Sequence, residues 1–148
     1  GTNMVGAMAV IENGEIKKSD YRKFLIRGQS GADDTKALTE ILARRLNHSE
    51  WPLPALIVVD GGRAQINASE KILKKYGKNI SVAAVVKDEK HRPKEILGMN
   101  HELRIMNYGR KEMGVNKYEE LEKEILLANA EAHRFAIAFH KKIRRQSL

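Results

Sequence analysis

The sequence predicts a mixed α/β fold, in which a sheet is covered on both sides by helices. Three short runs, residues 4–11, 55–59 and 80–86, are almost entirely apolar, as in strands that are buried on both faces. Segments with apolar residues at helical spacing separate and follow these runs. The predicted order is β-β-α-β-α-β-(ββ)-α, and this mixture of strands and helices determines the fold class.

The chain opens with a predicted hairpin. Residues 4–11 form its first strand, and Asn13-Gly14 follows as a turn in which both residues can take a positive φ. Residues 15–26 are predicted as the return strand. Its apolar positions are Ile16, Tyr21, Phe24 and Ile26.

The next predicted element is a helix with one apolar face. Asp33 or Asp34 can cap its start, and the helical spacing of apolar residues continues to about Asn47. The paired carboxylates could also hold a metal ion, but capping is the simpler interpretation.

Two buried strands follow, joined by a helix. Residues 55–59 lead to Asp60, and residues 80–86 lead to Lys87. Between them, residues 63–76 have the pattern of an amphipathic helix. Unbroken apolar strands on either side of a helix are typical of parallel pairing.

The last third of the chain ends in a long helix. Residues 88–93 form a charged loop, and residues 95–97 and 103–106 are predicted to form a small hairpin. Residues 115–145 are helical in pattern, with a break or bend predicted near Asn129.

Composition excludes several classes of protein. The 148 residues suit one domain with its own core, and the absence of cysteine excludes disulfide frameworks and zinc–thiolate sites. The apolar runs are too short to span a membrane, and the first residues lack the basic region of a signal peptide. The net charge of +8 favours an acidic partner, with nucleic acid first.

Asp60-Gly61-Gly62 is the first candidate site. Ligand sites of open α/β sheets form beyond the carboxyl ends of strands, where Asp60 is predicted to lie. The glycines would let a bulky ligand such as a phosphate backbone approach closely. In the alternative interpretation, Asp60 caps the next helix and the glycines only form a tight turn.

His133 is the second candidate. It shares one face of the predicted last helix with Asn129, Ile137 and His140. A helical histidine close to a strand-end aspartate could complete a divalent-metal site or transfer a proton. The alternative is a structural histidine, which is the commoner case.

Basic residues are the third feature. No acidic residue follows His133, whereas five basic residues do: Arg134, Lys141, Lys142, Arg144 and Arg145. They form either a solvated helix end that suits the helix dipole or a track for the phosphates of a nucleic acid. Arg63, Lys87, Lys90 and Arg92 follow the predicted strand ends and add positive charge to that edge.

Five segments carry motifs that occur together in one family. The most specific are D-G-G-x-x-Q-x-N-A at residues 60–68 and E-A-H-R-F-A-I-x-F-H-x-K at residues 131–142. The others lie at residues 14–24, 31–35 and 82–87. In order and spacing they resemble the C-terminal endonuclease domain of the UvrC family, which belongs to the ABC excinuclease of bacterial nucleotide excision repair.

This resemblance implies an RNase H-like fold, with a mixed sheet flanked by helices. It implies an endonuclease that uses Mg²⁺ or Mn²⁺ to hydrolyse a DNA phosphodiester on the 5′ side of a lesion. The implied partners are damaged double-stranded DNA and a DNA-bound helicase of the UvrB type, which other regions would contact. The implied setting is the cytoplasm and the SOS response.

The resemblance also assigns roles to residues. Asp60 and His133 match two members of the family's Asp-Asp-His set, so we expect them to be catalytic and to hold the metal. Asp34 and Glu131 are expected to support the site as acidic neighbours. The residues expected to contact nucleic acid are Arg63, Gln65, Lys87, Arg134, Lys141, Lys142, Arg144 and Arg145.

The sequence departs from the family pattern at both ends. The family's first catalytic Asp lies in a D-I-S-H-like segment just before the Gly-Thr that opens this chain. We therefore expect the single domain of residues 1–148 to lack that Asp and its central strand, and to be catalytically impaired as given. Ala130 stands where the family usually has an acid, and residues 143–148 resemble the start of a linker to a helix-hairpin-helix module.

Two other functions stay open on the sequence alone. The first is a non-catalytic or impaired nucleic-acid-binding domain of the same family, which the missing Asp favours. The second is an unrelated α/β enzyme with a nucleotide cofactor. The absence of a P-loop or a G-x-G-x-x-G motif argues against this second function.

Overall fold

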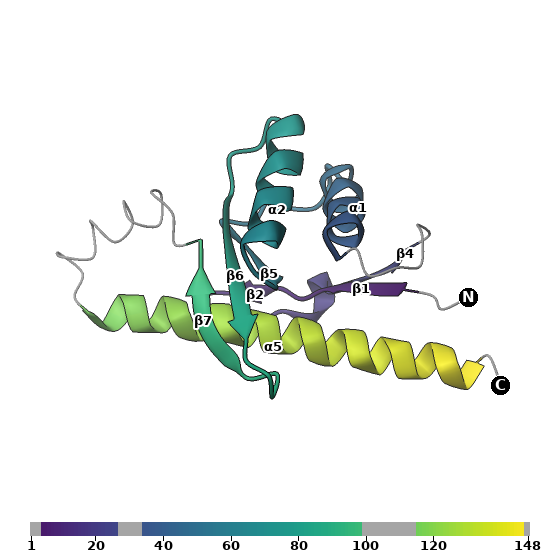
Figure 1. Ribbon diagram of the computed structural model, residues 1–148. Coiled ribbons are helices and arrows are strands. Elements are labelled where there is room, and N and C mark those ends of the chain that lie inside the picture. Colours follow the sequence, from purple (N-terminus) through teal and green to yellow (C-terminus); the bar gives the residue numbers. More distant parts are fainter. Residues whose placement is uncertain (1–3, 27–33, 99–114, 147–148) are drawn as a thin grey trace.

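The fold is a layer of strands between helices (Figure 1). The computed structural model describes residues 4–26, 34–98 and 115–146. Helix α5 (Val115–Gln146) packs on one side of the strands, and helices α1 (Asp34–Leu46) and α2 (Arg63–Lys75) pack on the other. The predicted mixed α/β fold with helices on both sides is confirmed.

The larger sheet contains three strands. Strand β5 (Leu56–Asp60) pairs in parallel with β6 (Ser81–Lys87), and β6 pairs antiparallel with β7 (Pro93–Leu97). Helix α2 connects the two parallel strands, as predicted. The central strand β6 is buried on both faces, because α2 and α5 cover it from opposite sides.

Residues 95–97 belong to β7, so the strand predicted there is present. One edge of β7 pairs with β6 across the charged loop that precedes β7, a pairing that was not predicted from the sequence. Asp88 stabilises this loop, because one of its carboxylate oxygens accepts the backbone N–H groups of Lys90 and Arg92, each at 2.9 Å. Residues 103–106, the expected partner strand, lie outside the described residues.

Side chains of the larger sheet alternate between two cores. Val59 and Val82 pack with Ile66 of α2 on one face. Val85 packs with Ile125 of α5 on the other face. This alternation determines which side of the sheet each strand-end residue faces.

The predicted hairpin at the start of the chain forms two separate pairs of strands. Strand β1 (Met4–Met8) pairs with β4 (Arg22–Ile26), and β2 (Ile11–Glu12) pairs with β3 (Glu15–Ile16). Asn13 and Gly14 have φ values of 53° and 79°, so the predicted turn with two positive φ angles is confirmed.

The prediction of two unbroken strands in this hairpin is wrong. A 3₁₀ turn, Lys18–Asp20, interrupts the return strand. The side chains of Tyr21 and Phe24 are three residues apart and both buried, but they face opposite sides. Tyr21 packs on Phe135 of α5, whereas Phe24 packs on Trp51.

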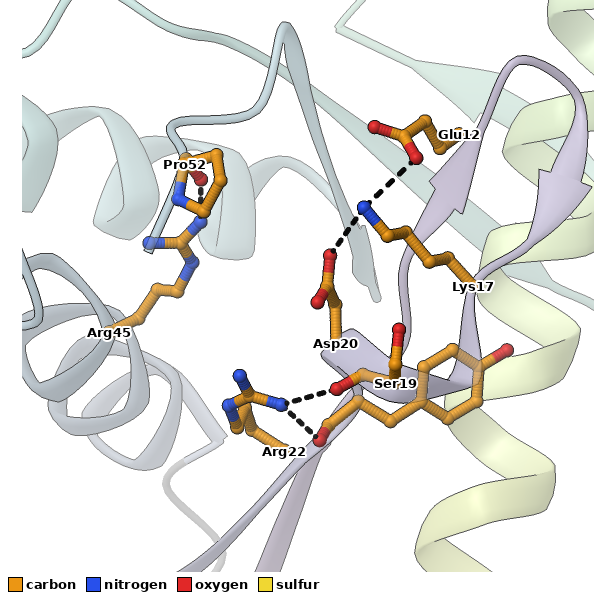
Figure 2. Close-up of polar contacts among 8 residues, drawn as sticks. Glu12, Lys17, Ser19, Asp20, Arg22, Arg45 and Pro52 are labelled. Atoms are coloured by element: carbon orange, nitrogen blue, oxygen red, sulfur yellow. Dashed lines mark hydrogen bonds and ion pairs between the residues drawn. The ribbon is translucent and has the colours of Figure 1, made fainter. Parts of the chain in front are cut away.

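Two arginines, Arg22 and Arg45, donate hydrogen bonds to backbone carbonyls close to Trp51 in the sequence or in space, and Figure 2 draws these bonds. Arg22 donates to two backbone carbonyls of the preceding turn, at 2.9 and 3.0 Å, and Arg45 of α1 donates to the carbonyl of Pro52. Both guanidinium groups lie over the Trp51 ring, at 4.8 and 5.6 Å from its centroid. These contacts anchor the connector that leads into β5.

In the part of the chain that the structure describes, the two main sheets each have an unpaired edge, one at β1 and one at β5. Among the described residues, β1 is hydrogen-bonded only to β4, and β5 only to β6. Helix α5 packs against both β1 and β5, so both sheets belong to the same layer (Figure 1). Within the described ranges, α5 joins the two sheets, and no strand pairing does.

The predicted break near Asn129 is wrong, because α5 is continuous from Val115 to Gln146. Asn side chains disfavour helix interiors when they compete for the helix backbone. Asn129 instead directs its amide to Asp60 on β5, so the helix hydrogen bonds continue past it. No helix within the described ranges is long and apolar enough to cross a membrane.

Candidate active site

Asp60 lies at the carboxyl end of β5, as predicted, and its side chain faces α5. Leu56 and Val58 belong to the core beneath α5, and Asp60 follows them at the same two-residue spacing. Because the strand ends here, its carboxylate lies at the edge of the sheet and its side chain is 63% exposed. The charged group is therefore accessible from solvent.

The turn after Asp60 depends on glycine. Gly61 has φ +130°, and a Cβ atom placed there would lie 2.5 Å from the Gln65 side chain. The Gln65 side chain instead reaches back to cap α2, accepting the backbone N–H of Gly62 at 2.7 Å. The interpretation of Asp60 as the cap is wrong, because Gly62 is the N-cap residue and Asp60 bonds elsewhere.

Two side chains hold Asp60 through the same oxygen. The ammonium of Lys87, at the end of β6, donates to Oδ1, and Asn129 of α5 donates to it from Nδ2 at 3.2 Å. Lys87 can reach Asp60 because it lies two residues beyond Val85, the partner of Asp60 in the parallel register.

These contacts keep Asp60 ionised. Desolvation by itself raises the pKa of Asp60, but hydrogen bonds from Lys87 and Asn129 outweigh it. The charges of Lys87 and His133 lower the pKa further, so it lies below the ordinary value of an aspartate. The site thus presents a carboxylate anion at neutral pH.

His133 lies one helical turn after Asn129 on α5, on the same face. Its side chain is exposed, and its charge acts on Asp60, 73 positions earlier in the sequence. The structure therefore brings the two residues that the motifs selected to one edge of the sheet. His140, two turns further along, is half-buried.

Glu131 is engaged in a separate network. Its carboxylate accepts the Tyr21 hydroxyl at 3.0 Å and two N–H groups of Arg134, at 2.8 and 2.9 Å. The Arg134 bonds are the main reason that the pKa of Glu131 falls to about 2. Burial and the bond to Glu131 raise the pKa of Tyr21 to about 12. This network anchors α5 to the start of β4.

The remaining predicted site residues lie at helix ends. Asp34 is the first residue of α1, and its side chain lies outside the described part of the chain. Arg63 is exposed at the start of α2. Four basic residues are exposed near the end of α5: Lys141, Lys142, Arg144 and Arg145.

The donors suit a divalent cation only in part. Asp60 supplies a carboxylate and His133 an imidazole, both ordinary ligands of Mn²⁺ and acceptable to Mg²⁺ when further oxygens are added. Among the side chains that the structure describes, no group of three such residues could hold an ion. A complete site needs at least one more ligand.

Sequence reasoning missed the contact made by Asn129. Its position on the His133 face was the available signal, but only the packing of α5 on β5 shows that the amide meets Asp60. The contact of the Lys87 ammonium with Asp60 was also not predicted, and the expected contact of Lys87 with nucleic acid stays a prediction.

Comparison with known proteins establishes the family. The family described as the UvrC RNase H endonuclease domain matches residues 1–137. The UvrABC system protein C of Lachnospira eligens is 38% identical over 156 residues, covering 97% of this chain and 24% of the relative. That of Clostridium botulinum strain 657 is 36% identical over 162 residues, covering 97% and 25%.

The UvrABC system protein C of Caldicellulosiruptor saccharolyticus is 34% identical over 150 residues, covering all of this chain and 24% of the relative. The chain thus spans about a quarter of the length of these relatives. The resemblance seen in the motifs is confirmed, and the chain belongs to the UvrC RNase H endonuclease domain family.

Proposed function

We propose that this chain is a metal-dependent DNA endonuclease domain of nucleotide excision repair, which hydrolyses a phosphodiester on the 5′ side of a lesion. The observation that carries this proposal is the approach of His133 on α5 to the ionised Asp60 at the end of β5. It would act in the cytoplasm on damaged double-stranded DNA, together with a helicase of the UvrB type. The name UvrABC system protein C, which these relatives carry, supports action together with other Uvr proteins.

Asp60 and His133 would hold Mg²⁺ or Mn²⁺. When bound, the ion would polarise the phosphoryl oxygens and lower the pKa of a water for in-line attack. Lys87 and Asn129 keep Asp60 ionised, so no proton has to leave before a cation binds. Each bonds Oδ1, and Oδ2 accepts no hydrogen bond from the described residues.

A further carboxylate would complete the site. The resemblance implies an additional Asp on a central strand, and we propose that this strand lies between β1 and β5. Two observations support its place: both strands have an unpaired edge among the described residues, and α5 packs against both. A strand there would satisfy backbone groups that otherwise face solvent.

Exposed basic residues would position the DNA strand. Arg63 follows Asp60 closely, and the basic end of α5 continues beyond His133. Contacts with phosphates fix the register of DNA without reading bases, as a repair nuclease that accepts varied sequences requires.

One observation favours a second candidate function, a non-catalytic nucleic-acid-binding domain. The described side chains include no group of three metal-binding residues. If Asp60 and His133 were the only metal ligands, the site would hold no catalytic ion, and the same basic surfaces would bind DNA without cutting it. The two functions differ in cleavage and not in binding.

The test is an incision assay with the full-length protein and its partner proteins, on a duplex with one defined lesion in Mg²⁺. Asp60→Asn and His133→Ala should each lower the rate of 5′ incision by at least about 100-fold, since the metal contributes several kcal/mol to the transition state. His140→Ala replaces the histidine two turns further along α5 and is the matched control. This variant should make the 5′ incision at the wild-type rate.

Unchanged 5′ incision in both variants would refute the site assignment. Wild-type protein that binds the duplex but does not incise it would support the second candidate function instead. DNA affinity is measured in parallel, and we expect Asp60→Asn to retain it.

A further inference from the structure

Asn129 is a buried polar residue whose hydrogen bond crosses to another element. The residue is 7% exposed, and Nδ2 donates to Asp60 Oδ1 at 3.2 Å. The other buried polar side chain of the described residues, Ser69, bonds only the backbone of its own helix, at Gln65. Burying an amide is costly unless a partner compensates it, and here the partner is the candidate catalytic carboxylate.

The bond restricts how Asp60 can rotate. Asn129 from α5 and Lys87 from β6 approach the same oxygen, Oδ1, from two different elements. With Oδ1 held by two donors, the carboxylate has a preferred orientation. The second oxygen, Oδ2, takes no hydrogen bond from the residues that the structure describes, and the Asp60 side chain as a whole is 63% exposed.

The same bond sets the position of His133. Asn129 precedes His133 by four residues, one turn of a continuous helix, so both side chains lie on the same face. Fixing Asn129 against the end of β5 fixes the height and rotation of α5 at this point. His133 thereby lies one helical turn from the bond between Asn129 and Asp60, and its charge lowers the pKa of Asp60.

We propose that Asn129 is a positioning residue of the centre formed by Asp60 and His133. It does not touch the metal or the DNA: it acts through Asp60, by orienting the carboxylate and by setting the register of α5. The inference rests on the proposed function, because a carboxylate and an imidazole need this alignment only if they share a ligand. Mutation of a residue that hydrogen-bonds a metal ligand, without itself touching the metal, typically lowers metal affinity by 10- to 100-fold.

The first test measures Mn²⁺ affinity by isothermal titration calorimetry. Asn129→Leu keeps the branching at Cγ and removes the donor, although leucine is the larger residue, so we expect affinity to fall about 10-fold or more. Ser69→Ala, which removes the other buried polar side chain, is the matched control and should bind Mn²⁺ like wild type. Thermal unfolding of both variants reports any general loss of stability.

The second test separates positioning from substrate binding. In the full-length protein, Asn129→Leu should lower kcat for 5′ incision about 10-fold with little change in KM for DNA, because DNA contacts are untouched. If the substitution only weakened the fold, activity would fall in proportion to the fraction of unfolded protein. Asn129→Ala is the comparison variant, because it removes packing atoms as well as the hydrogen-bond donor.

The third test needs no metal. In NMR spectra of the metal-free chain, Asp60→Asn should shift the side-chain amide signals of Asn129, and Asn129→Leu should shift the ring signals of His133. The ring signals of His140 are the internal control and should stay in place. This readout separates the inference from the proposed function: full-length wild type that binds no Mn²⁺ and makes no 5′ incision would refute the function, while these shifts still test the positioning.

Three results would overturn the inference. They are wild-type Mn²⁺ affinity in Asn129→Leu, an equal loss in Asn129→Leu and Ser69→Ala, and His133 ring signals that do not respond to Asn129→Leu.

Discussion

At the scale of single residues, Gly61 shows how closely the backbone approaches the helix that follows Asp60. Its φ of +130° is unfavourable for any residue with a Cβ atom, and that atom would lie 2.5 Å from the Gln65 side chain. We predict that Gly61→Ala lowers the free energy of unfolding by about 1–3 kcal/mol, measured by urea denaturation.

Gly62 provides the matched control for this prediction. A Cβ atom there meets no atom within 4 Å, and its φ of −137° is ordinary for other residues. Gly62→Ala should therefore change stability by no more than about 0.5 kcal/mol. Equal effects at the two positions would show that the turn is not constrained as described.

Glu131 gives a prediction for pH. Its folded pKa, about 2, lies below its ordinary value of 4.5, so it stabilises the fold above pH 4.5 and loses this contribution as the pH falls toward 2. Glu131→Gln should therefore be less stable than wild type at pH 7, and the difference should shrink between pH 4.5 and 2.

Urea denaturation across this pH range measures that difference directly. Glu70→Gln, on an exposed position of α2, is the control and should show little difference from wild type at any of these pH values. A difference between Glu131→Gln and wild type that stays constant with pH would contradict the network with Tyr21 and Arg134.

At the scale of elements, the sequence pattern predicted those parts whose structure is determined locally. Strand β6 is one residue from its predicted bounds at either end, and α2 begins at the predicted Arg63, because apolar runs and helical spacing reflect burial directly. The hairpin strands were misjudged because the 3₁₀ turn at Lys18–Asp20 interrupts the return strand before β4, and the apolar pattern of residues 15–26 does not report it.

The residues of the candidate site were predictable from the sequence, but the contacts between them were not. Asp60 follows from its place after an apolar run, and His133 from a motif on a helix. The contact of Asn129 with Asp60 spans 69 positions and arises only when α5 packs on β5, so no local pattern reports it. The ammonium of Lys87 on Asp60 likewise depends on the register of β5 and β6.

Helix α5 should derive its stability from one face. Ile125 is 1% exposed and packs with Ala83 and Val85, whereas Ile137 on the same helix is 42% exposed. We predict that Ile125→Ala lowers the free energy of unfolding by about 2–5 kcal/mol, measured in urea.

Ile137→Ala removes the same atoms from an exposed position and should cost about 0.5 kcal/mol or less. A comparable loss in both variants would mean that α5 is not held against β6 through Ile125.

At the scale of the whole molecule, one long helix joins two sheets that do not pair with each other among the described residues. The candidate centre lies where α5 passes the end of β5, so its geometry depends on the docking of that helix as well as on the strand. The net charge of +8 and the basic end of α5 suit an extended polyanion that passes this edge.

The central claim is that Asp60 and His133 share one cation. The most direct measurement is a titration with Mn²⁺ followed by NMR of the histidine rings, since a paramagnetic ion broadens signals close to it. We predict that the His133 ring broadens at lower Mn²⁺ concentration than the His140 ring, and that Asp60→Asn abolishes this difference. Equal broadening of both rings, or broadening of His133 that persists in Asp60→Asn, would contradict the claim.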